Sequence, residues 1–296
     1  MSKKILLLVN PFSGTGKSLV AAQYLEKNLV DCTIITVLSE YKGYFIDFLH
    51  KEDLTPYAMI VVLGGDGTMH EVTQALAERD NLPPIQLFPC GSGNAFNHDI
   101  GNLDWATALE KLKRGMIKRV DIFKMTFPLA PIKDKILYGF NIVGWGLVSD
   151  INASAENMRW LGTARYTAAA LIHIFRNPRF KGKVVVDDAV YEGDFCFVLA
   201  CNTQHTGKAM KIAPLAALDD GLLDVLVIKH VPFFHLLRLF PLIFSGEHIH
   251  SKLVIYRKAR SITIDCEPMH INIDGESKCQ APFSVEVLGG KLPMIV

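Results

Sequence analysis

The sequence lacks the features that mark several specialised classes of protein. Its 296 residues carry a formal net charge of only +1, so overall charge does not favour nucleic acid or another polyanionic partner. No stretch approaches the roughly 20 apolar residues of a membrane span, and the nearest one, residues 231–244, contains His235, Arg238 and Pro241. Its six cysteines form no C-x-x-C pair, which disfavours zinc and thioredoxin-like chemistry.

The first part of the chain alternates apolar runs with amphipathic segments. Half of all residues are hydrophobic and 21% are charged, which is the balance of a folded globular protein. The predicted strands are residues 4–10, 32–38, 57–64 and 85–90, and the predicted helices are residues 18–28, 44–50, 68–79 and 104–115. Asp104 is expected to cap the last helix at its start and Gly115 to end it. This order predicts a parallel, doubly wound α/β domain.

Beyond about Met125 the pattern changes to strands joined by turns. These strands are expected within residues 135–146, 181–202, 220–230, 261–276 and 283–290, with helices only at 164–175 and 233–244. The pattern predicts a second, mainly antiparallel β domain. We place the domains at residues 1–128 and 129–296.

The stretch "VNPFSGTGKS", residues 9–18, ends like a nucleotide-binding P-loop. The P-loop pattern requires a glycine five positions before Gly16, and Pro11 occupies that place. Ser13, Gly14 and Gly16 still lie between a strand and a helix, where backbone N–H groups can face an anion. An ordinary strand–helix turn remains the alternative at this point.

Two further glycine-rich turns follow predicted strands. In "GGDGT", residues 64–68, three glycines flank Asp66, which could hold Mg²⁺ or take a proton from a hydroxyl. "GSGN", residues 91–94, repeats the arrangement one strand later. Because parallel sheets bind ligands at the carboxyl ends of their strands, the three turns together predict a site for nucleotide phosphates.

"NPFSG", "GGDGT" and "GSGN" in this order resemble the diacylglycerol kinase catalytic domain family of lipid kinases. "RWLGTARY", residues 159–166, is similar to a central motif of sphingosine and ceramide kinases, and "IDGE", residues 273–276, to the family's C-terminal active-site motif. The resemblance implies an α/β nucleotide domain followed by a β-sandwich-like lipid-substrate domain. It places the active site in the interdomain cleft, and the end of the chain packs back on the first domain.

The resemblance also implies roles for individual residues. The residues expected to bind ATP are Asn10, Ser13, Gly14, Ser39, Gly64, Gly65, Gly67, Thr68, Glu71, Gly91, Ser92, Gly93, Arg159 and Arg165. Branches of the family differ in the general base, so we favour Asp66 and keep Asp274 and Glu276 as candidates for the base or for ATP–Mg²⁺ binding. Without the resemblance, "DGE" at 274–276 reads equally well as a hairpin turn.

Two further sites follow from the resemblance. The loop "APLAALDDGLLDV" is similar to a structural Mg²⁺ site, with the Asp220 carboxylate and the carbonyls of Ala217 and Leu222 as ligands; a plain turn is the alternative. Asp150 and Asn152 are the candidates for contacting the lipid. Sphingosine kinases place an acid at the second of these positions, so Asn152 departs from that branch.

The sequence therefore predicts an ATP- and Mg²⁺-dependent kinase that phosphorylates a hydroxyl of a membrane lipid, either diacylglycerol or a sphingoid base or ceramide. An NAD kinase-like enzyme and a catalytically silent nucleotide- or lipid-binding module are the alternatives. We expect a cytoplasmic protein that visits membranes transiently, with no nucleic-acid partner; a homodimer is left open.

Overall fold

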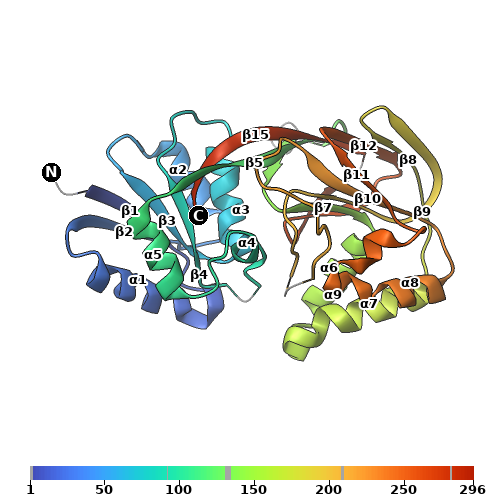
Figure 1. Ribbon diagram of the computed structural model, residues 1–296, viewed down its shortest axis with the longest axis horizontal. Coiled ribbons are helices and arrows are strands. Elements are labelled where there is room, and N and C mark those ends of the chain that lie inside the picture. The colour runs from blue at the N-terminus through green and yellow to red at the C-terminus, as the bar shows by residue number, and fades with distance from the viewer. Residues whose placement is uncertain (1–2, 92, 131–134, 208–209, 281) are drawn as a thin grey trace. The chain divides into compact units, whose positions relative to one another are not determined.

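A computed structural model describes residues 3–91, 93–130, 135–207, 210–280 and 282–296 (Figure 1). The chain divides into two compact units. Unit 1 comprises Met1–Ile122 and Gly289–Val296, and unit 2 comprises Phe123–Leu288. The sequence therefore leaves unit 1, builds unit 2, and returns to unit 1 for its last eight residues.

Unit 1 is built around a parallel sheet. The strands are β1 (Lys3–Val9), β2 (Cys32–Leu38), β3 (Met59–Gly64) and β4 (Ile85–Pro89), in the order β2–β1–β3–β4. Strand β15 (Phe283–Ile295) joins β4 in parallel, with Met294 paired to Ile85. The central strands are buried almost throughout because helices cover both faces. The predicted α/β class is confirmed.

The helices of unit 1 include the four predicted ones, which begin and end near the predicted residues, and a further short helix after the third glycine turn. They are α1 (Lys17–Asn28), α2 (Tyr44–Lys51), α3 (Asp66–Leu76), α4 (Ala95–Asp99) and α5 (Trp105–Arg114), with a short 3₁₀ turn at Ser13–Gly16. Figure 1 shows α1 and α5 on one face of the sheet and α2 and α3 on the other. The Asp104 carboxylate accepts the Thr107 N–H at 2.9 Å, and left-handed Gly115 ends α5, as predicted.

Unit 2 is mainly antiparallel β-structure, as predicted. Its strands are β6 (Ile136–Gly139), β7 (Ile142–Gly146), β8 (Phe180–Val186), β9 (Ala189–Cys201), β10 (Leu223–Lys229), β11 (Ile255–Ala259), β12 (Ser261–Cys266), β13 (His270–Ile273) and β14 (Glu276–Gln280). Strand β5 (Ile117–Thr126) enters from unit 1, and the first part of β15 pairs with β12. Alternate residues of these strands bury a core that includes Phe123, Trp145 and Phe195.

The helical segments of unit 2 differ from the prediction at two points. They are α6 (Leu147–Asn157), a 3₁₀ segment (Arg159–Ala164), α7 (Arg165–Arg176), α8 (Phe233–Leu239), α9 (Leu242–Ser245) and a 3₁₀ turn (Glu247–His250). Helix α6 was not predicted. The single helix expected at 233–244 is broken in two at Pro241, whose missing N–H and fixed φ interrupt it. Among the described residues, no helix has the length and apolar character needed to cross a bilayer.

Candidate functional site

The turn after β1 is made by backbone in the left-handed region. Gly14, Thr15 and Gly16 all have φ between 57° and 90°. A Cβ added at Gly14 would lie 2.1 Å from the carbonyl oxygen of Cys90, so only glycine fits there. At Gly16 a Cβ would meet nothing within 4 Å. The turn that resembles a P-loop thus lies against the end of β4. That contact requires glycine at position 14, whereas position 16 favours glycine only through its positive φ.

The turns after β3 and β4 touch each other through their backbones. A Cβ on Gly65 would lie 2.9 Å from the Cα of Gly91, and a Cβ on Gly91 would lie 2.5 Å from the Cα of Gly65. At Gly64 a Cβ would overlap the side chain of Thr68. The second and third glycine turns, which were predicted to lie at the same edge of the sheet, are therefore in direct contact. Ser92, predicted to belong to this cluster, lies outside the described residues.

Asn10 and Thr68 connect the first turn to the second. The Asn10 side-chain amide donates to the Thr68 hydroxyl at 3.0 Å, and the Asn10 carbonyl accepts the Ser13 N–H at 3.0 Å and the Ser18 hydroxyl. The Asn10 N–H donates to the Leu63 carbonyl at 3.0 Å. These bonds fix the exit of β1 against the exit of β3.

Asp66 begins α3 and bridges to the turn after β4. Its carboxylate oxygens accept the backbone N–H groups of Ala95 at 3.0 Å and Phe96 at 3.3 Å, which are the first residues of α4. A Cβ on Gly93 would lie 3.4 Å from Asp66 Oδ2. Asp66 is half-buried, and its carboxylate holds the two turns together.

Glu71 and Ser39 lie beside this cluster. The Glu71 carboxylate accepts the N–H of Gly43 at 2.8 Å and of Phe45 at 3.4 Å, so it caps the start of α2. Ser39, which follows β2, is buried and donates its N–H to the Val9 carbonyl at 3.0 Å. The structure thus gives both residues a role in joining elements of unit 1.

The "DGE" motif of unit 2 is a hairpin turn. Asp274 and Gly275 have φ of 52° and 90°, and Ile273 pairs with Glu276 across the two-residue turn. This is the Asp-Gly pattern that type I′ hairpins favour. The hairpin interpretation is therefore correct for the backbone.

The Asp274 carboxylate is buried and receives three backbone N–H groups. Oδ1 accepts from Asn141 at 2.9 Å and Ile142 at 3.0 Å, and Oδ2 accepts from Phe140 at 3.2 Å. These residues form the link from β6 to β7. Asp274 therefore anchors that link, whereas Glu276, two residues on, is only partly buried.

Asn152 also contacts this hairpin. Its side-chain amide donates to the Gly275 carbonyl at 2.7 Å, and it is buried on α6. Asp150 lies on the same helix and is half-buried; burial raises the pKa of its carboxyl, and nearby His173 opposes that rise. His173 in turn shares a hydrogen bond of 2.7 Å with the Ser154 hydroxyl.

The two predicted arginines lie in the α6–α7 connection. Arg165 is the first residue of α7, and its guanidinium stacks 4.8 Å from the ring centre of Tyr166 and donates to the Tyr166 hydroxyl at 3.2 Å. Arg159 begins the preceding 3₁₀ segment, and its side chain lies outside the described part of the structure.

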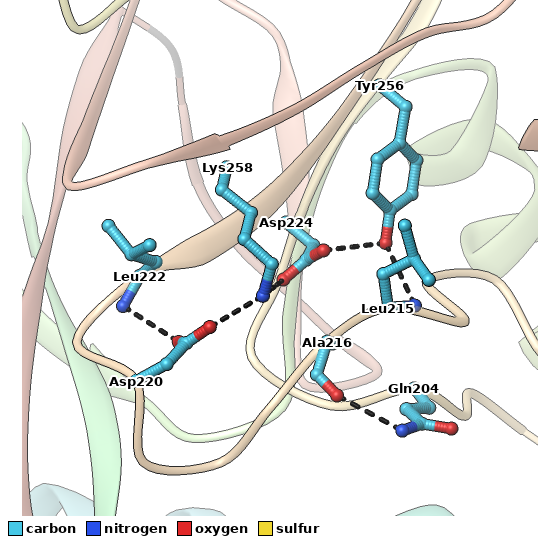
Figure 2. A network of polar contacts seen from close by, with 8 residues as sticks. All are labelled: Gln204, Leu215, Ala216, Asp220, Leu222, Asp224, Tyr256 and Lys258. Carbon is cyan, nitrogen blue, oxygen red and sulfur yellow. Dashed lines mark hydrogen bonds and ion pairs between the residues drawn. The ribbon is translucent and has the colours of Figure 1, made fainter.

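In the loop predicted to hold a structural Mg²⁺, the Asp220 carboxylate is bonded to groups of the protein itself (Figure 2). Asp220 accepts the Leu222 N–H at 3.1 Å and the Lys258 ammonium at 2.5 Å. The same ammonium lies 3.3 Å from Asp224, which also accepts the Tyr256 hydroxyl at 2.7 Å. Leu222 thus offers Asp220 its N–H.

Lys258 and Tyr256 were not singled out from the sequence. The signal that could have found them is Asp224, an acid in the apolar run "LLDVLVI", because a buried carboxylate needs partners. Neither partner is near in sequence, so the pairing required knowledge of which strand lies beside β10.

Two family matches together span most of the chain. Residues 4–125 match the diacylglycerol kinase catalytic domain, and residues 141–296 match the YegS C-terminal NAD kinase beta sandwich-like domain. The glycine turns and Asp66 lie in the first match, and the Asp274 hairpin and the Lys258 network lie in the second.

Individual relatives and a solved structure agree with these matches. A diacylglycerol kinase of Bacillus subtilis is 27% identical over 75% of this chain and 72% of its own length. Sphingoid long chain base kinase 4 of Schizosaccharomyces pombe is 27% identical over 97% of this chain and 73% of its own. The crystal structure of a putative diacylglycerol kinase from Bacillus anthracis superposes with a TM-score of 0.81 at 26% identity, covering 99% of this chain and 97% of that one.

The class of protein defined by this fold and these matches is the lipid kinases, which are phosphotransferases. The chain belongs to the diacylglycerol kinase catalytic domain family, with a C-terminal domain of the YegS type. The relation to NAD kinases is one of architecture in that second domain.

Proposed function

We propose that the protein transfers the γ-phosphate of ATP to a hydroxyl group of a membrane lipid, with Mg²⁺ as the metal. One observation carries the proposal. Three glycine-bearing turns follow the adjacent strands β1, β3 and β4, and they contact each other at points where a Cβ would not fit. Such backbone at the carboxyl edge of a parallel sheet suits a polyphosphate, which backbone N–H groups can approach closely.

The residues that would hold the nucleotide are those of the three turns. The backbone N–H groups of residues 14–16, 65–67 and 93–94 would face the phosphates, with the Asn10–Thr68 pair fixing the first two turns. When bound, Mg²⁺ would neutralise the charge that develops between the β- and γ-phosphates. We also assign Arg159 and Arg165 to contact with the phosphates. Ser39 and Glu71 are assigned to contact with the nucleotide or its metal.

We propose Asp66 as the general base and Glu276 as the alternative. Asp66 lies inside the second glycine turn and is half-buried, whereas Asp274 is buried. Asp274 is less suited to proton transfer, because its two oxygens already accept three buried N–H groups. We therefore assign Asp274 to positioning Glu276 and the β6–β7 link.

We propose a neutral acceptor such as diacylglycerol ahead of a sphingoid base. A carboxylate would be needed to pair with the ammonium of a sphingoid base, and Asn152 is an uncharged amide already bonded to Gly275. Burial also raises the pKa of the Asp150 carboxyl, which weakens it as a partner for a cation. The lipid is expected to be collected at a membrane surface, and the oligomeric state is outside the proposal.

The test is phosphate transfer from labelled ATP to a panel of acceptors in mixed micelles with Mg²⁺. The panel holds diacylglycerol, ceramide, sphingosine, undecaprenol and NAD. Phosphorylation of diacylglycerol above the other acceptors is the expected result. Labelling of NAD and of no lipid would overturn the proposal in favour of an NAD kinase, and nucleotide binding without any transfer would favour a silent binding module.

The two candidate bases are separated by Asp66→Asn and Glu276→Gln. Replacement of the base is expected to lower kcat by about 10²–10⁴-fold while nucleotide affinity changes little. Equal large losses in both variants would contradict a single base, and a large loss confined to Glu276→Gln would transfer the assignment to that residue.

A further inference from the structure

A buried acid on β10 faces a lysine on the neighbouring strand. Asp224 is fully buried, and the antiparallel register of β10 and β11 pairs it directly with Lys258. Tyr256, two residues before Lys258, lies on the same face of β11, diagonal to Asp224. The register therefore delivers an ammonium and a phenol hydroxyl to one buried carboxylate.

The Lys258 ammonium lies between two carboxylates (Figure 2). It is 2.5 Å from Asp220 Oδ2 and 3.3 Å from Asp224 Oδ2. Asp224 Oδ1 accepts the Tyr256 hydroxyl, but Oδ2 is buried and accepts no aligned hydrogen bond within the described residues. The negative charge of that oxygen is thus compensated mainly by the positive charge of Lys258, as a carboxylate's charge is compensated by a bound cation.

The network also holds the loop before β10. The Tyr256 hydroxyl accepts the Leu215 N–H at 3.3 Å, and Asp220 accepts the N–H of Leu222. Gln204 donates to the Ala216 carbonyl at 3.1 Å (Figure 2). The loop therefore depends on the same buried carboxylate and ammonium that fix β10 to β11.

The surroundings do not fit a divalent ion at this position while Lys258 is present. Both oxygens of Asp220 already accept a hydrogen bond, one from the Leu222 N–H and one from the Lys258 ammonium. A divalent cation on Asp220 would lie beside the lysine charge and be repelled by it. Within the described ranges no group of three or more His, Cys, Asp or Glu side chains could hold a metal ion.

We infer that the ammonium of Lys258 is the resident cation of this site, and that it takes the place of a divalent metal ion in stabilising the loop 213–222. Removal of the ammonium takes away the counter-ion that the described residues give Asp220 and Asp224, and it turns the site into one that binds a divalent cation. The inference concerns stability, and it does not depend on the proposed kinase activity.

The test measures thermal unfolding of nucleotide-free, chelator-treated protein with and without millimolar MgCl₂. The parent protein is expected to unfold at the same temperature in both conditions. Lys258→Met keeps the length of the side chain and removes its charge; it is expected to lower Tm by about 5–10 °C, because a buried carboxylate loses its partner. MgCl₂ is then expected to restore most of that loss.

Two further variants serve as controls. Lys183→Met removes a lysine that pairs with Glu192 at 3.2 Å on an exposed face of unit 2, so it is expected to change Tm by no more than about 3 °C, with no response to MgCl₂. The double variant Lys258→Met/Asp220→Asn lacks the exposed carboxylate, so its Tm is expected not to recover with MgCl₂.

Two results would overturn the inference. One is a parent protein whose Tm rises with MgCl₂, with the rise lost in Asp220→Asn, because a metal would then coexist with the lysine. The other is a Lys258→Met variant that is destabilised, whose Tm does not respond to MgCl₂, and that binds no Mn²⁺ when MnCl₂ is added and followed by electron paramagnetic resonance. If Lys258→Met does not fold, the comparison of the parent with Asp220→Asn decides alone.

Discussion

The glycine turns of unit 1 and the Lys258 network of unit 2 satisfy carboxylates in different ways. In unit 1, Asp66 and Glu71 each accept backbone N–H groups at the start of a helix. In unit 2, Asp224 is met by the side chains of Tyr256 and Lys258. In both arrangements the partners are distant in sequence; the first uses backbone N–H groups at helix starts, and the second uses side chains of a neighbouring strand.

This difference has a consequence for ligand binding. Turns built from glycine backbone can bring N–H groups close to a large anion without side chains in between. A network of buried side chains already contains its own counter-ion, so its effect is on stability. The comparison therefore supports the proposal that the turns of unit 1 bind phosphate, and it gives the Lys258 network a role in stability.

The largest expected effect comes from Asp274→Ala. Asp274 is a carboxylate of unit 2 that is bonded by backbone N–H groups, as Asp66 and Glu71 are in unit 1. The change leaves the N–H groups of Phe140, Asn141 and Ile142 without their acceptor. We expect the free energy of unfolding to fall by at least about 3 kcal/mol, measured by urea denaturation. Glu276→Gln, two residues away and partly exposed, is the control, with a loss below about 1 kcal/mol. Similar losses in the two variants would contradict an anchoring role for Asp274.

Gly14→Ala is expected to have the next largest effect. It combines a positive φ of 57° with a Cβ that would lie 2.1 Å from the Cys90 carbonyl oxygen, so we expect a loss of about 2–4 kcal/mol. Gly16→Ala in the same turn has φ of 90° but open space around the Cβ, so its cost is the backbone strain of about 1–2 kcal/mol. Thermal and urea unfolding compare the two, and equal losses would show that the contact with Cys90 imposes no constraint.

Glu71→Gln sharpens the comparison at a single helix start. The amide has one acceptor oxygen where the carboxylate has two, so one of the N–H groups of Gly43 and Phe45 loses its partner. We expect a loss of about 1 kcal/mol in unfolding free energy. A fall in kcat/KM well beyond tenfold at intact stability would show that Glu71 also contacts the nucleotide or its metal.

The smallest effect is a pH dependence of stability from buried histidines of unit 2. Burial lowers the pKa of His248, and of His173 despite the nearby Asp150. The folded protein therefore binds fewer protons than the unfolded chain below about pH 6.5, so stability is complete above that pH and falls as pH decreases. His248→Gln keeps a donor for the Ile212 carbonyl, which His248 meets at 2.9 Å. This variant should show a shallower fall of Tm between pH 7.5 and 5, and an unchanged slope would exclude His248 as a cause.

The parts of the fold that local patterns determine could be predicted from the sequence. The glycines within residues 64–67 and 91–93 indicated turns after buried strands. The capping residues Asp104 and Gly115 indicated where α5 begins and ends. Each of these depends on a few consecutive residues. The Asp-Gly pair at 274–275 likewise offered the hairpin as one of its two interpretations, and the structure contains that hairpin.

What could not be predicted depends on contacts between distant segments. Helix α6, "LVSDINASAEN", is rich in Ser, Asp and Asn, which favour helices poorly. It is stabilised by packing on α7 and by contacts such as the Asn152 bond to Gly275. The Lys258 network arises from the pairing of β10 with β11, and nothing in residues 217–222 shows that a lysine at 258 lies beside them.

The return of the sequence to unit 1 has a consequence for biosynthesis. Met294 of β15 pairs with Ile85 of β4, so the sheet of unit 1 gains its neighbour on that side only from residues translated after all of unit 2. Until then, the ribosome carries an α/β half with an open strand edge, a surface on which chains associate wrongly. The order of translation therefore makes completion of the sheet of unit 1 the last step of folding, after the β half has been synthesised.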